Sequence, residues 1–200
     1  GYSWAHSFGN TGGDNAYGLE IDAQNNAIFA GNFNNGVDFD PGTGSYTLTA
    51  PGVLHGVVCS YDPSGNFLWT KQLVTTQSLY GYYLKTDAYG SIYVSGIFQG
   101  ETDFDPDTSS YLISSTPSNY DVYVAKYTNQ GDFVWAFPYF GDISSDRPFG
   151  LGIDADFNVY SSGHFGDTVD FDPSNGTYNL VSNAYSDQYM AKYSQCIEES

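Results

Sequence analysis

The motif Asp-Phe-Asp-Pro, in which one residue separates two aspartates, occurs three times in the sequence, beginning at Asp38, Asp103 and Asp170. In an extended segment, residues two apart point to the same side, so the two carboxylates of a pair face together. Such oxygen ligands suit Ca2+, which takes roughly six to eight of them. Ca2+ is therefore a candidate cofactor, and its candidate ligands are Asp38, Asp40, Asp103, Asp105, Asp107, Asp170 and Asp172.

The same carboxylates could instead accept hydrogen bonds from backbone N–H groups and so form turns. The motif lacks the full Asp-x-Asp-x-Asp-Gly series and the distal Glu of an EF-hand loop. Turn chemistry would repeat along the chain just as a metal site would, so both interpretations stay open. If calcium binds, replacing Asp103 and Asp105 by Asn should lower stability in calcium but not in a chelator.

The aspartate motif is one part of a longer internal repeat. Its three copies are 65 and 67 residues apart, and Trp4, Trp69 and Trp135 are 65 and 66 residues apart. A chain that repeats itself at a fixed period is an array of one supersecondary unit. Other identical triples at this period are Asp22/Asp87/Asp154, Gly31/Gly96/Gly163, Phe33/Phe98/Phe165 and Tyr46/Tyr111/Tyr178.

Composition and periodicity predict an all-β class. The chain has 19 Tyr and 14 Phe, which favour strands, and 23 Gly and 8 Pro, which supply turns. No segment shows helical periodicity over a long window. In the first copy the expected strands are 17–22, 27–33, 45–49, 56–61 and 66–73.

Each ~66-residue repeat is therefore predicted to be a four-stranded antiparallel meander, with an insertion that carries the Asp-Phe-Asp-Pro motif. Such meanders in series are the blades of a β-propeller. We expect a β-propeller-like array of three units within residues 1–195, at about 1–65, 66–131 and 132–195, followed by a linker at 196–200. Residues 2–8 match the outer strand of a unit and could complete the last one.

Three blades are fewer than the roughly four to eight of typical propellers. Three explanations stay open. The chain is a fragment of a longer propeller, or two chains share a ring, or the terminal strands pair head to tail in a homo-oligomer or filament.

The charge restricts the partners. Asp and Glu number 23 against 5 Lys and Arg, a net charge of −18, which disfavours nucleic acid and anionic membranes. No apolar run is long enough for a membrane-spanning helix, so we expect no membrane insertion. Cys59 and Cys196 are the only cysteines, and a bond between them is left open.

Several segments resemble the SBBP repeat, a bacterial β-propeller repeat found in large secreted or surface proteins of Bacteroidetes. The segments are Gly65–Lys71, Ile92–Phe98, Thr168–Pro173 and Tyr123–Tyr127. The resemblance covers residues 2–195. It implies an extracellular or cell-surface location reached by type IX secretion, and a scaffold or adhesive role without a shared catalytic motif.

The symmetry of the repeat argues against an enzyme. Carboxylate pairs can act as general acid and base on glycosides, but an active site normally breaks repeat symmetry. His6, His55 and His164 occupy unrelated repeat positions and fit no metal spacing. We expect a non-enzymatic structural or adhesive module, calcium-stabilised and self-assembling through its terminal strands.

The alternative function is a propeller that binds carbohydrate or cleaves polysaccharide. Exposed Trp and Tyr side chains can stack on sugars. Packing between units explains the repeated Trp4, Trp69 and Trp135 better. Tyr80, Tyr82, Tyr83 and Tyr89 form a cluster that the other copies do not repeat, and they are the better candidates for contact with a surface glycan.

Overall fold

The computed structural model describes residues 1–115, 119–141, 146–174 and 176–195, and the secondary structure in these ranges is entirely strands and turns. The first unit contains β1 (Asn15–Ile21), β2 (Ala27–Asp38), β3 (Thr47–Tyr61) and β4 (Phe67–Thr75). No membrane-spanning helix was found among the described residues.

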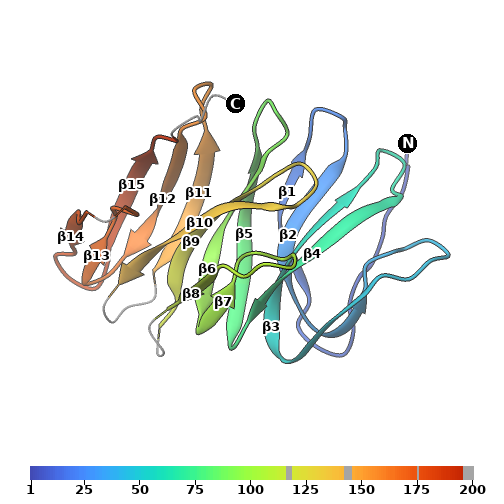
Figure 1. The fold of residues 1–200 in the computed structure, drawn as a ribbon, viewed down its shortest axis with the longest axis horizontal. Coiled ribbons are helices and arrows are strands. Elements are labelled where there is room, and N and C mark those ends of the chain that lie inside the picture. The colour runs from blue at the N-terminus through green and yellow to red at the C-terminus, as the bar shows by residue number, and fades with distance from the viewer. Residues whose placement is uncertain (116–118, 142–145, 175, 196–200) are drawn as a thin grey trace.

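The second unit contains β5 (Ser78–Thr86), β6 (Ile92–Gln99), β7 (Glu101–Asp103), β8 (Leu112–Ser114), β9 (Asp121–Tyr127) and β10 (Phe133–Gly141). The third unit contains β11 (Arg147–Ile153), β12 (Val159–Phe165), β13 (Thr168–Asp170), β14 (Asn179–Val181) and β15 (Asp187–Tyr193). The units lie side by side along the long axis of the molecule (Figure 1).

The main strands of the first two units pair in the four-stranded antiparallel order that the sequence predicts, whereas the described third unit has three main strands. The antiparallel orders are β1–β2–β3–β4 in the first unit and β5–β6–β9–β10 in the second. The third unit pairs as β11–β12–β15. The described strands form an open array rather than a closed ring (Figure 1).

In the second and third units, the aspartate motif lies on a hairpin that pairs with a strand of the preceding unit. The β7–β8 hairpin pairs with β4 of the first unit through Val74↔Asp103. The β13–β14 hairpin pairs with β10 of the second unit through Phe140↔Asp170. In the first unit the corresponding hairpin is formed by the end of β2 and the start of β3. The sequence pattern predicts the insertion but not its pairing across units.

A bulge on the first strand of each unit (β1, β5 and β11) explains why the opposing residue is glycine in all three repeats. The register of the first strand shifts between Ala16 and Gly18, between Gly81 and Tyr83, and between Pro148 and Gly150. The opposing glycine on the second strand faces a carbonyl group of the bulged strand. A Cβ there would overlap the carbonyl oxygen of Asn15, Tyr80 or Arg147, and the glycines are Gly31, Gly96 and Gly163.

Apolar side chains fill the spaces between units. One buried cluster joins the first and second units and has Trp69 against it. A second cluster joins the second and third units and has Trp135 against it. These two tryptophans therefore pack between units.

The repeat predicts a strand at residues 2–8, but the structure has no strand within residues 1–14. The segment lies against the first unit. Phe8 stacks on Phe29 and Tyr61, and Trp4 Nε1 donates to Pro63 O at 3.1 Å. β15 lies at the opposite end of the array from the N terminus (Figure 1). Residues 2–8 have no neighbouring strand with which to form backbone hydrogen bonds. That they complete the last unit stays a prediction.

Candidate functional site

The first aspartate of each motif holds the hairpin turn by accepting two backbone hydrogen bonds. Oδ1 of Asp38 accepts from the N–H groups of Asp40 and Tyr46, at 3.0 and 2.8 Å. Oδ1 of Asp103 and Oδ1 of Asp170 each accept the equivalent pair. The donors to Asp103 are Asp105 N at 3.1 Å and Tyr111 N at 2.9 Å. The donors to Asp170 are Asp172 N at 3.0 Å and Tyr178 N at 2.8 Å.

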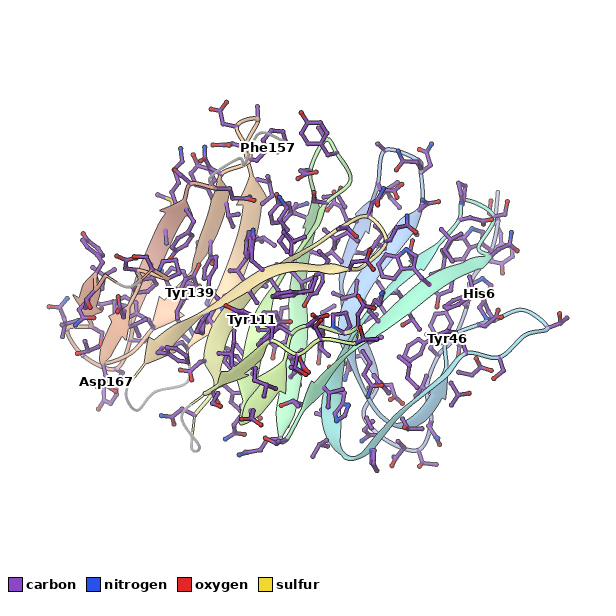
Figure 2. All side chains as sticks on the ribbon, viewed as in Figure 1. His6, Tyr46, Tyr111, Tyr139, Phe157 and Asp167 are labelled. Carbon is purple, nitrogen blue, oxygen red and sulfur yellow. The ribbon has the colours of Figure 1, made fainter. Side chains whose placement is uncertain are left out.

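The second aspartate closes the tip of the same turn. Oδ1 of Asp40 accepts from Gly42 N at 2.8 Å, Oδ1 of Asp105 from Asp107 N at 3.1 Å, and Oδ1 of Asp172 from Ser174 N at 2.9 Å. Tyr46 and Tyr111, where the first two turns end, lie on different units along the array (Figure 2). One carboxylate oxygen of every paired aspartate is therefore bonded to backbone, as expected of turn chemistry.

The phenylalanine between the aspartates points into the core, as its alternation with them predicts. Phe39, Phe104 and Phe171 are all buried. Each meets the phenylalanine of its unit's second strand edge-on, with ring centroids 5.4 to 5.5 Å apart. A tyrosine hydroxyl from the end of the third main strand donates to the carbonyl of each, and the donors are Tyr61, Tyr127 and Tyr193. The turn is thus fixed to the core of its own unit.

Backbone donors also set the electrostatics of the turns. Hydrogen bonds from Tyr46 N–H and Asp40 N–H lower the pKa of the Asp38 carboxyl. Ser174, through its side chain and then its backbone, lowers the pKa of Asp172. Both carboxyls are exposed, and a carboxylate that accepts such bonds stays ionised to lower pH than a free one.

Asp107 takes part in an ion pair between units. Its Oδ1 lies 2.6 Å from Nζ of Lys71, which also lies 3.3 Å from Oδ1 of Asp132. Lys71 belongs to β4 of the first unit and both aspartates belong to the second. This contact gives Asp107 a role that does not need a metal.

No group of three or more acidic, histidine or cysteine side chains arranged for a metal was found in the described ranges. Ca2+ binding by the paired aspartates stays a prediction. We expect calcium to raise the thermal unfolding midpoint of the wild type, and the double variant Asp103→Asn, Asp105→Asn to lose that gain. Differential scanning fluorimetry in calcium and in EDTA measures both. Equal midpoints of the wild type in the two buffers would contradict calcium binding.

The hairpin turns between main strands use the same aspartate chemistry. Oδ1 of Asp22 accepts from Gln24 N and Asn26 N, and Asp62, Asp87 and Asp154 repeat this pattern. The Asn158 side chain is the largest cause that lowers the pKa of Asp154, to about 2.

These lowered pKa values predict a loss of stability in acid. A carboxyl whose folded pKa lies below its unfolded value stabilises the fold above the unfolded pKa, and this contribution is lost as pH falls through the folded pKa. We expect urea midpoints to fall between about pH 4 and about pH 2. The urea midpoint of the Asp154→Asn variant should fall less steeply across this pH window. An equal decline in that variant would contradict the assignment.

The structure separates the other candidate residues. His6 lies at the N-terminal end of the array (Figure 2), His55 is buried, and His164 meets Phe149 edge-on. Tyr80 and Tyr82 stack on each other and pack against the core between the second and third units. Tyr89 is 78% exposed and stacks on Phe157 at 5.0 Å. Cys59 is buried with Sγ 2.8 Å from Thr70 Oγ1, and Cys196 lies outside the described residues.

One groove was missed by the sequence pattern because its walls come from different units. It has a volume of about 1040 Å³ and lies between β10 and the end of β15. Trp135 and Phe137 form one wall, and Tyr89, Phe157, Lys126 and Lys192 also line it.

No family model matches the sequence. The chain is similar to an uncharacterized WD repeat-containing protein of Acanthamoeba polyphaga mimivirus, with 25% identity over 216 residues. The match covers 95% of this chain and 15% of that protein, so the chain spans a small part of its relative. This distant similarity and the 15 strands among the described residues indicate an all-β, β-propeller-like repeat fold.

Proposed function

We propose that the chain is a non-enzymatic, structural or adhesive β-propeller module of a secreted or cell-surface protein. The observation that carries this proposal is the equivalence of the three aspartate turns, in which Asp38, Asp103 and Asp170 accept the same pair of backbone hydrogen bonds. A carboxylate that accepts the same backbone hydrogen bonds in every unit stabilises the turn, whereas a catalytic carboxylate would differ in its hydrogen bonds from its equivalents in the other units.

The finer architecture belongs to the same proposal. We regard the chain as three ~66-residue blades of SBBP type, like those of secreted Bacteroidetes proteins that leave by a type IX route. The four-stranded order of the first two units and the repeated bulges support the blade assignment. A surface with net charge −18 suits a soluble extracellular module.

Surface exposure in cells that produce the protein tests this proposal. An antibody raised against residues 1–195 should label intact cells or the medium, and added protease should remove the cell-bound signal. Labelling that requires permeabilised cells would contradict an extracellular module. A cytoplasmic marker protein, which must stay unlabelled in intact cells, is the control.

The groove between β10 and β15 supports a second candidate function, the binding of a surface glycan. The stacked Tyr89–Phe157 pair and the Trp135–Phe137 wall offer aromatic faces, and Lys126 and Lys192 offer hydrogen-bond donors. A glycan array with the wild type and Tyr89→Ala tests it. Tyr185→Ala is a matched control because Tyr185 is 99% exposed and does not line the groove. Release of reducing sugar from polysaccharides would instead show cleavage.

A further inference from the structure

The outer strand of the first unit, β4, is paired along only part of its outer edge. β3 pairs with the inner edge of β4 from Phe67 to Leu73. On the outer edge, β7 of the second unit pairs with Val74 and Thr75 alone. Among the described residues, no strand continues this pairing toward the start of β4. Both neighbours of β4 are described, so the open stretch would remain whatever units precede or follow this chain.

The backbone groups that face the open stretch follow from the pairing. In an antiparallel ladder, the N–H and C=O groups of one residue point to one edge of the strand, and those of the next residue point to the other edge. Val74 pairs outward with β7, and the N–H of Thr76 donates to Glu101 O at 2.8 Å. The even-numbered residues at this end of β4 therefore face outward, and the groups of Thr70 and Gln72 face the open stretch.

The second unit supports this assignment. Pro138 of β10 occupies the repeat position of Gln72 and pairs with Tyr123 of β9. Proline has no N–H group, so it is tolerated in an edge strand where that group would point away from the neighbouring strand. The outer edge of β10 thus lacks a donor at this position, whereas β4 keeps the N–H of Gln72.

A groove of about 480 Å³ lies beside the open stretch. Residues 67–72 of β4 line it, and Pro106, Asp107 and Gln130 of the second unit also line it. The groove therefore offers room for an extended segment next to the outward backbone groups of β4.

The two faces of β4 give the groove different chemistry. Val74 is 49% exposed on one face, and Lys71 points to the opposite face. Nζ of Lys71 lies 2.6 Å from Asp107 and 3.3 Å from Asp132. These two carboxylates are 40% and 56% exposed, whereas the Lys71 side chain is only 19% exposed. One face is therefore apolar, and the other presents more negative than positive charge.

From the pairing of β7 on the same edge and from these charges, we propose that the open stretch of β4 binds an extended peptide in which lysine or arginine alternates with apolar residues. The peptide adds a strand beyond β7 and bonds to the backbone of Thr70 and Gln72. Alternation directs its cationic side chains toward Asp107 and Asp132 and its apolar side chains toward Val74. The net charge of −18 favours the approach of such a partner. This inference goes beyond the proposed structural or adhesive role and does not rest on an extracellular location.

Fluorescence anisotropy with a labelled peptide of alternating lysine and valine tests the added strand. Gln72→Pro removes the outward N–H group, and the equivalent Pro138 shows that the repeat accommodates proline there. This variant should keep its circular dichroism spectrum and bind about tenfold more weakly or worse. Gln72→Ala is the matched control, because it loses the same side-chain contacts with Thr49 and His55 but keeps the N–H group. It should bind like the wild type.

Three outcomes would overturn the added strand: no binding to the wild type, unchanged binding to Gln72→Pro, or an equal loss in Gln72→Ala. A peptide of the same sequence that is N-methylated at every residue separates strand addition from general attraction to an acidic surface. It keeps the charge but has no N–H groups, so it should not bind. Equal binding of the two peptides would also overturn the proposal.

A charge variant tests the chemistry assigned to the partner. Asp107→Asn should weaken binding of the unmethylated peptide, because one of the two carboxylates beside Lys71 becomes neutral. Asp156→Asn is the control, since it makes the same change at an exposed turn of the third unit and should leave binding unchanged. Equal affinities of Asp107→Asn and the wild type would overturn the assignment of a cationic partner.

Discussion

Replacing Phe104 by Ala is expected to lower the free energy of unfolding by about 3–5 kcal/mol. Phe104 is fully buried, meets Phe98 edge-on at 5.5 Å and lies 4.9 Å from the ring of Tyr123. It is also the residue between Asp103 and Asp105, and its carbonyl accepts the Tyr127 hydroxyl. Its removal therefore leaves a cavity and also loosens the hairpin that pairs with β4.

Urea unfolding followed by tyrosine and tryptophan fluorescence measures this loss. Phe140→Ala makes the same chemical change at a side chain that is 44% exposed, and we expect it to cost far less. Similar losses in the two variants would show that the motif phenylalanine is not a core residue. A loss at Phe104 below about 1 kcal/mol would contradict its place between the units.

Gly96→Ala is expected to be the second most damaging single change. Its Cβ would overlap the carbonyl oxygen of Tyr80 at the bulge of β5, and a backbone group cannot move aside as a flexible side chain can. Overpacking of this kind costs about 1–3 kcal/mol, and contact with backbone places the expected loss at or above the upper end.

Gly152→Ala is the matched control for Gly96→Ala. Gly152 also lies in a strand, but an added Cβ would find its nearest neighbour 3.9 Å away on Tyr160. The urea midpoint of Gly152→Ala should equal or slightly exceed that of the wild type, because alanine lowers the conformational entropy of the unfolded chain. If Gly96→Ala matched this control, the bulge would not explain the repeated glycine.

The strand order of the units follows from local signals and was predictable. Aspartate turns, alternating apolar residues and a fixed period all lie within one repeat, so one chain suffices to find them. The same holds for the motif phenylalanines, whose burial follows from their alternation with Asp38 and Asp40.

Contacts between units were not predictable in this way. The pairing of Asp103 with Val74 joins residues 29 positions apart in different units, and periodicity carries no information about it. The bulge opposite Gly96 shows in the sequence only as an identical glycine. The groove at Trp135 is lined by residues of the second and third units, and a pattern within one repeat does not show which residues of two units come together.

The choice between metal ligand and turn residue was also beyond the sequence, because both need carboxylates at the same spacing. The structure shows that Oδ1 of Asp103 accepts from Asp105 N and Tyr111 N. Asparagine also presents a side-chain oxygen that can accept these bonds, whereas alanine has none.

The most direct test of the structural role is thermal unfolding in EDTA of matched Asn and Ala variants at Asp38, Asp103 and Asp170. We predict that each Asn variant unfolds near the wild-type temperature and that each Ala variant unfolds clearly lower, in all three units alike. The account would be contradicted if Asn were as damaging as Ala, or if one unit alone responded, because a single sensitive copy would mark a specialised site rather than a repeated turn.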